Sequence, residues 1–191
     1  MSDTDTDEFD RLRRRVLWAM PTGLFVVGSR AGGVRNLMTC NWVMQIATAP
    51  KLVAVAVESG SVTRDLIERG RSFSVNVLAR SDRSLVRRFV KPVRDVDVDG
   101  DGVATALQGE PVFEVAGGLP CLVASVAWLA CDVRSVSTWD DLVADAGRPP
   151  TASHVLVVGE VVGAGESDRL ATLGEDDGIL SMTDTRMNYG G

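Results

Sequence analysis

Apolar residues alternate with polar ones, or form short unbroken runs, over much of the chain. These patterns predict strands at 22–28, 36–46, 52–58, 73–78, 119–136 and 154–162. A buried helix at 119–136 stays open, because periodicity alone cannot separate it from a strand. The stretches 95–118 and 179–191 can hold only short strands. Many strands and few helices favour a mostly antiparallel β fold with flanking helices over repeated strand–helix–strand units.

Helical spacing occurs near the N-terminus, in a run that Pro21 ends. Its apolar positions are Phe9, Leu12, Val16, Leu17 and Met20. Gly32-Gly33 then marks a turn.

Two more helices are predicted in the middle of the chain. Ser61 or Thr63 caps one that runs to Arg69, and Gly70 stands where a C′ glycine belongs. Ser81 caps the other, in which apolar residues face each other at i,i+4 over 85–90. The stretch 140–152 reads as a loop or a short helix.

Length and composition narrow the class of protein. The 191 residues fit one domain, predicted over 9–191, after a mobile acidic tail at 1–8. The net charge of -6 argues against a general nucleic-acid surface. The N-terminus has no apolar signal region, and no apolar run reaches the roughly 18 residues of a membrane helix. Three cysteines without a C-x-x-C pair indicate a reducing compartment, so a cytoplasmic location is expected.

Two segments offer binding chemistry for an anion. Hydroxyls gather at the predicted start of the helix at 61–69, where free backbone N–H groups favour a phosphate. The alternative is that Ser61 or Thr63 is only a helix cap. A second segment holds six cations against Asp82, although a solvated helix face explains most of them. These cations are Arg80, Arg83, Arg87, Arg88, Lys91 and Arg94.

Two apparent motifs are rejected. The start of a calcium loop at 95–100 has Ala106 where the bidentate Glu would stand. The segment 163–168 begins like a dinucleotide fingerprint, but Asp168 stands in place of the third glycine. The segment also lacks the strand–helix–strand setting of that motif. One histidine and scattered cysteines do not make a metal site, so no metal is expected.

Six short motifs in order along the chain carry a family resemblance. They are Met20-Pro21-Thr22-Gly23; Asn36-Leu37-Met38-Thr39-Cys40-Asn41-Trp42; Ser61-Val62-Thr63; Phe73-Ser74-Val75-Asn76-Val77-Leu78; Gly118-Leu119-Pro120 with Trp128 beyond it; and the strand that begins at His154. Together they resemble the flavin-reductase-like family, which binds FMN in an antiparallel split β-barrel. Lys51, a longer 137–152 segment and a tail without the usual aromatic ending depart from that pattern.

The resemblance implies residues for a flavin site. The ring would be edged by Asn36, Met38, Thr39, Cys40, Asn41 and Trp42. The phosphate would meet Ser59, Ser61 and Thr63, and Arg88 or Lys91 would reach the phosphate or a nicotinamide. His154 would lie beside the flavin and act in catalysis, and Arg186 and Tyr189 would close the site. Alternatives are that Trp42 belongs to the core and that His154 is structural.

The function that the resemblance implies is NAD(P)H-dependent reduction of flavin. Hydride would pass from nicotinamide C4 to flavin N5, and the protein would supply placement and electrostatics. A homodimer is implied, and a monooxygenase or another electron acceptor could receive the reduced flavin. Alternatives are a flavoredoxin-like electron carrier with tightly bound FMN, and a flavin-binding barrel without turnover. The residues do not distinguish FMN from FAD or a deazaflavin, or NADH from NADPH.

Overall fold

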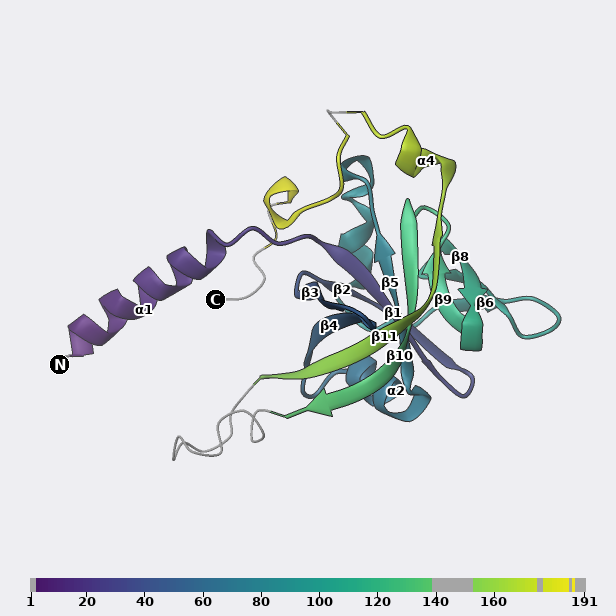
Figure 1. Ribbon diagram of the computed structural model, residues 1–191, viewed down its shortest axis with the longest axis horizontal. Coiled ribbons are helices and arrows are strands. Elements are labelled where there is room, and N and C mark those ends of the chain that lie inside the picture. Colours follow the sequence, from purple (N-terminus) through teal and green to yellow (C-terminus); the bar gives the residue numbers. More distant parts are fainter. Residues whose placement is uncertain (1–2, 139–152, 175–176, 186, 188–191) are drawn as a thin grey trace.

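The computed structural model describes residues 3–138, 153–174, 177–185 and 187. Antiparallel strands make up most of the regular structure in these residues (Figure 1). The strands are β1 (Phe25–Ala31), β2 (Val34–Cys40), β3 (Val43–Thr48), β4 (Lys51–Glu58), β5 (Ser72–Val77), β6 (Val96–Val98), β7 (Ala104–Leu107), β8 (Glu110–Val115), β9 (Leu119–Leu122), β10 (Ala127–Ser137) and β11 (His154–Glu166). The predicted class, mostly antiparallel β with few helices, is confirmed.

The larger of the two sheets has seven strands, in the order β2-β1-β5-β10-β11-β4-β3. Its edge strands β2 and β3 follow each other in the chain, yet no ladder joins them in the described residues, so the sheet does not close into a barrel. A four-stranded sheet, β6-β7-β8-β9, packs beside it. The side chains of Ser74 and Asn76 bond to the backbone of Pro120 and Leu122, which fastens β5 to β9.

Two groups of buried apolar side chains fill the interior. One lies between the large sheet and the helix at 62–70 and includes Val27, Val55 and Phe73. The other lies between the large sheet, β9 and the 180–182 segment, and includes Leu24, Phe89 and Leu180. The alternation of the strands produces this division, because successive side chains point to opposite faces of a sheet.

The helices are short except for the first. They are α1 (Asp3–Trp18), α2 (Val62–Gly70) and α4 (Asp168–Ala171), with single 3₁₀ turns η1 (Arg80–Asp82), η2 (Leu85–Phe89), η3 (Ala116–Gly118) and η4 (Met182–Asp184). Figure 1 shows α1 extending away from the sheets. It begins at Asp3, so the boundary predicted at residue 8 between tail and domain lies inside the helix. No helix of the described residues is long and apolar enough to cross a membrane.

Several predicted boundaries were wrong. The expected strand at 36–46 is two strands, broken at Asn41 and Trp42, and the run 119–136 is β9 and β10. The helix expected after Ser81 is the pair of turns η1 and η2. The stretch 140–152 lies outside the described residues.

Gly70 does not take the predicted C′ position. It is the last residue of α2, and Arg71 adopts the left-handed conformation with φ 54° and donates its N–H to the carbonyl of Ile67. A Cβ on Gly70 would sit 1.9 Å from the carbonyl oxygen of Arg30. The glycine is therefore needed for the close approach of α2 to β1.

Candidate functional site

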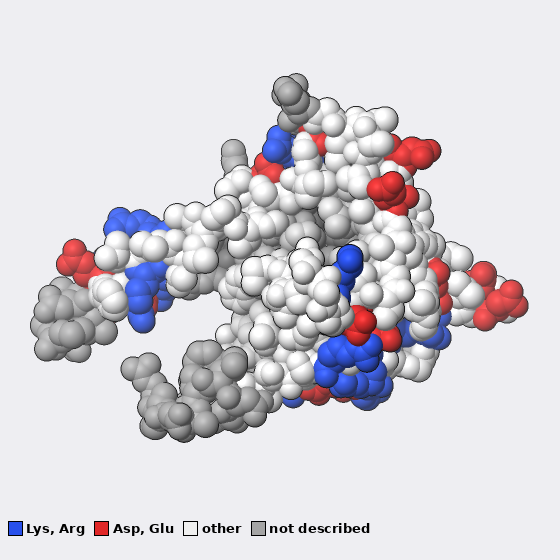
Figure 2. All heavy atoms as spheres, in the orientation of Figure 1, with Lys and Arg blue, Asp and Glu red and all other residues white. Residues whose placement is uncertain are grey.

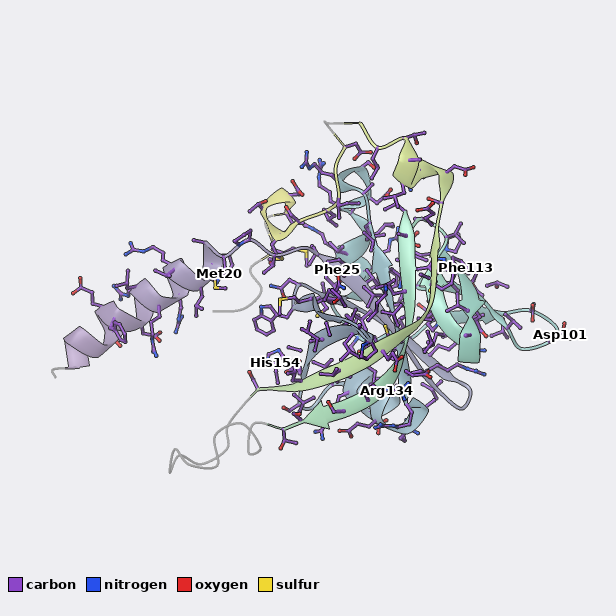
Figure 3. All side chains as sticks on the ribbon, viewed as in Figure 1. Met20, Phe25, Asp101, Phe113, Arg134 and His154 are labelled. Carbon is purple, nitrogen blue, oxygen red and sulfur yellow. The ribbon has the colours of Figure 1, made fainter. Side chains whose placement is uncertain are left out.

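The end of β2, the turn that leads into β3, the end of β4 and the first residue of β11 meet around a cavity of about 280 Å³. Antiparallel pairing of β4 with β11 sets His154 opposite Glu58, and the N–H of Ala56 bonds to the carbonyl of Trp42 at 3.0 Å. Figure 3 labels His154 where β11 begins. The lining consists of Met38, Thr39, Cys40, Asn41, Trp42, Ala56, Glu58, Val90 and His154.

Trp42 and His154 form an aromatic wall of this cavity. Their ring centroids are 4.7 Å apart at an interplanar angle of 74°, which is an edge-to-face contact. Trp42 is 38% exposed, so the alternative that it belongs to the core is wrong. The contact joins the turn between β2 and β3 to the first residue of β11.

The His154 ring is held by its neighbours. Its Nδ1 lies 2.7 Å from the hydroxyl oxygen of Ser153. Partial burial lowers the pKa of His154, and the nearby Glu58 carboxylate opposes this shift by favouring the charged ring. Because burial is the larger effect, the neutral imidazole predominates at neutral pH.

Thr39 and Cys40 face different sides of β2. The Thr39 hydroxyl donates to the carbonyl of Val86 at 2.5 Å, which ties η2 to the strand. The Cys40 thiol lies 3.6 Å from the carbonyl oxygen of Ala56, and burial raises its pKa to about 11. It is therefore a thiol at neutral pH and not a nucleophilic thiolate.

Asn36 and Thr63 are not among the cavity residues. Thr63 is 1% exposed, and its hydroxyl oxygen accepts from the amide of Asn36 at 2.9 Å. The Asn36 amide oxygen accepts from the N–H of Val93 at 2.8 Å. These buried bonds hold α2 and the 90–94 segment against β2.

Ser59 and Ser61 lie at the start of α2, just beyond the cavity residue Glu58. The Ser61 side chain caps the helix by accepting from the N–H of Arg64 at 3.1 Å. The carbonyl of Ser59 accepts from the Arg64 guanidinium at 2.9 Å. Ser61 therefore caps α2, as the alternative to a phosphate site held, and the helix start carries positive potential.

The predicted cations point in different directions. Arg88 pairs with Glu110 at 2.7 Å, so its side chain is directed to β8. Lys91 is exposed and follows the cavity residue Val90. Arg186 and Tyr189 lie outside the described residues.

Three lining residues were missed from the sequence: Ala56, Glu58 and Val90. Alternation along β4 places Ala56 and Glu58 on one face, but only the pairing with β11 turns that face toward His154. Val90 was predicted to pack on Val86 within a helix, and no sequence signal marked it for a site. In the described residues no group of three or more His, Cys, Asp or Glu is placed to hold a metal ion.

Comparisons with known proteins identify the family and the fold of the chain. The model of the flavin reductase like domain matches residues 17–183. A flavin reductase of Pseudomonas putida is 27% identical over 179 residues, covering 93% of this chain and 87% of that protein. The flavin reductase component of a bacterial two-component tryptophan halogenase has a similar fold, with a TM-score of 0.62 at 24% identity over 84% of this chain and 89% of that one.

Some relatives are much longer than this chain. Diflavin flavoprotein A 2 of Synechocystis is 26% identical over 129 residues, which are 67% of this chain but 21% of that protein. The chain therefore spans about a fifth of the length of this relative.

Proposed function

Because the chain belongs to the flavin reductase like family, we propose that it is an NAD(P)H:flavin oxidoreductase that binds FMN. The family match covers most of the sequence, including every residue that lines the cavity. The Pseudomonas putida relative, similar over nearly the whole chain, is itself named a flavin reductase. Both findings support an oxidoreductase, as the sequence predicted.

The observation that carries the proposal is the cavity at the β2–β3 turn. Its apolar and aromatic lining suits a flat ring, and polar groups of Asn41, Glu58 and His154 suit the ring's edges. Its volume of about 280 Å³ is just below the range for small-molecule pockets, roughly 300–1,000 Å³. We therefore propose that the cavity takes the ring and that the phosphate lies outside it, toward the start of α2.

A flavin bound there would supply an acceptor for hydride at its N5 atom. The proposed contribution of the chain is placement. Met38, Cys40 and Trp42 would border the ring, and His154 would orient the reacting ligand. Ser59, Ser61 and Lys91 would favour the phosphate.

The contacts limit three of the predicted roles. Asn36 and Thr63 would support the site through their mutual hydrogen bond rather than touch the ring. Arg88 would need to leave Glu110 to reach a phosphate.

We further propose that two copies assemble and that the reduced flavin passes to an oxygenating enzyme. The halogenase component is named as the flavin reductase of a two-component system, so that protein has a partner enzyme, a halogenase. The single domain over 9–191, the cytoplasmic location and the choice of FMN over FAD stay predictions.

A second candidate is the flavoredoxin-like electron carrier, and a diflavin flavoprotein is among the relatives of the chain. In that reading the chain would keep its FMN and receive electrons from a protein, without using a nicotinamide. The cavity alone suits either role.

The test is anaerobic reduction of excess FMN by NADH or by NADPH, followed by the loss of visible flavin absorbance. Rapid, catalytic bleaching is expected, and the faster nucleotide reports the preference. Bound flavin that stays oxidised with both nucleotides would contradict the reductase and favour the carrier. A control without protein measures the direct reaction between nucleotide and flavin.

A further inference from the structure

Two polar side chains of the cavity lie side by side. Glu58 on β4 and His154 on β11 are directly opposite in the antiparallel ladder, and both line the cavity. Opposed residues of this kind have Cβ atoms roughly 4.5–5.5 Å apart. In the part of the chain that the structure describes, the Glu58 carboxylate has neither a hydrogen bond nor an ion pair. Its acceptor capacity is therefore available to a ligand.

His154 offers the complementary group. Its Nδ1 is occupied by the Ser153 hydroxyl, which leaves Nε2 as the remaining polar atom of the ring. When the hydroxyl donates to Nδ1, the neutral imidazole carries its proton on Nε2 and is a donor. The cavity wall thus presents an acceptor next to a donor, beside the Trp42 ring.

We propose that Glu58 and His154 together recognise an amide edge of the bound ligand. The carboxylate would accept from the ligand's N–H, and the imidazole would donate to the adjacent carbonyl. This inference rests on the proposed function, in which two ligands carry such an edge. They are the nicotinamide, with its carboxamide, and the flavin ring, whose N3–H stands between two carbonyls.

The remaining lining does not compete for this role. Cys40 is the other titratable side chain of the cavity, and its thiol stays neutral. Lys91 adjoins Val90 along the chain but does not line the cavity. Glu58 is therefore the charged group that a ligand meets there, and a hydrogen bond to a charged group is stronger than one between neutral groups.

The test measures binding by calorimetry with two ligand pairs. NAD⁺ is compared with its 3-acetylpyridine analogue, which keeps the carbonyl but lacks the amide N–H. FMN is compared with N3-methyl FMN, which lacks the N3–H. The wild-type protein is expected to prefer the amide-bearing member of one pair by roughly 10- to 100-fold. Glu58→Ala should abolish that preference, and the affected pair identifies the recognised ligand.

Glu160→Ala is the matched control. Glu160 lies in the same β4–β11 ladder, opposite Leu52, and its carboxylate pairs with Arg134. This variant should keep the wild-type preference. Glu58→Gln, which retains a neutral acceptor, should keep part of it and guards against a misfolded alanine variant.

Two results would overturn the inference: a wild-type protein without preference in either pair, or a Glu58→Ala protein with the wild-type preference in both. A protein that bleaches FMN catalytically but shows either result refutes only the recognition by Glu58 and His154. A protein that binds neither nucleotide nor flavin refutes the proposed function as well.

Discussion

His154 is the only histidine of the chain, and its place decides much of the chemistry of the cavity. The ring contacts Trp42, bonds to Ser153 and faces Glu58 across the ladder. A neutral imidazole in this position can orient a ligand without adding charge. A protonated imidazole would attract an anionic ligand, so the pKa of His154 decides which of these two forms a ligand meets.

The first prediction concerns the titration of His154. Burial lowers its pKa, so its NMR resonances should show a midpoint below the ordinary value of about 6.5. Glu58→Gln removes the carboxylate that favours the charged ring, so the midpoint should move lower still. A sole histidine gives an unambiguous signal in protein without a histidine tag. Glu160→Gln should leave the midpoint unchanged, and an unchanged or higher midpoint in Glu58→Gln would contradict the assignment.

The sequence predicted the part of the site that is contiguous. Met38 to Trp42 stand together in one motif, so their resemblance to a family pattern could be recognised before the fold was known. Glu58 and Val90 come from other segments, and each looks ordinary in its own context. Strand pairing and the packing of η2 bring them to the cavity, and no local pattern contains that information.

The elements that position the cavity are β4, β11 and the turn between β2 and β3. Short apolar runs predicted β4 and β11 well, because β4 is buried on both faces at 53–55 and β11 alternates between buried and partly exposed residues. The hydrophobic pattern missed the break at Asn41 and Trp42, since polar and aromatic residues there continue an acceptable strand pattern. The i,i+4 spacing of apolar residues predicted a helix after Ser81, but the chain forms two 3₁₀ turns there.

The second prediction tests how closely α2 must approach β1. Gly70→Ala places a Cβ 1.9 Å from the carbonyl oxygen of Arg30, so the helix or the strand must move. Such overpacking typically costs about 1–3 kcal/mol of unfolding free energy. The loss should appear in chemical denaturation followed by circular dichroism.

Gly33→Ala is the control for this substitution. A Cβ on Gly33 would meet no atom within 4 Å, so its unfolding free energy should stay near that of the wild type. Equal stability of Gly70→Ala and Gly33→Ala would show that the contact between α2 and Arg30 is not as tight as the structure has it.

The whole molecule leaves much apolar surface uncovered. In α1, Phe9, Leu12 and Val16 are exposed and follow one another at intervals of three and four, so they share one face of the helix. The edge strand β3 exposes Met44 and Ile46 close to the cavity residue Trp42. Figure 2 shows charged side chains gathered on α1 and at the rim of the body, with a largely uncharged surface between them. The exposed apolar residues of α1 and β3 are of the kind that marks an interaction site.

The third prediction is that a second copy covers this surface. Charges placed on the apolar face of α1 should disrupt the assembly, because burial of a charge without a partner is costly. Leu12→Glu combined with Val16→Glu should therefore convert a dimer into a monomer in sedimentation velocity. Val34→Glu, at an exposed apolar position in the β1–β2 hairpin, should remain dimeric.

A wild-type monomer, or a double variant that sediments as the wild type does, would contradict this role of α1. If the monomeric variant also loses affinity for FMN while keeping its circular dichroism spectrum, the second copy contributes to the site itself.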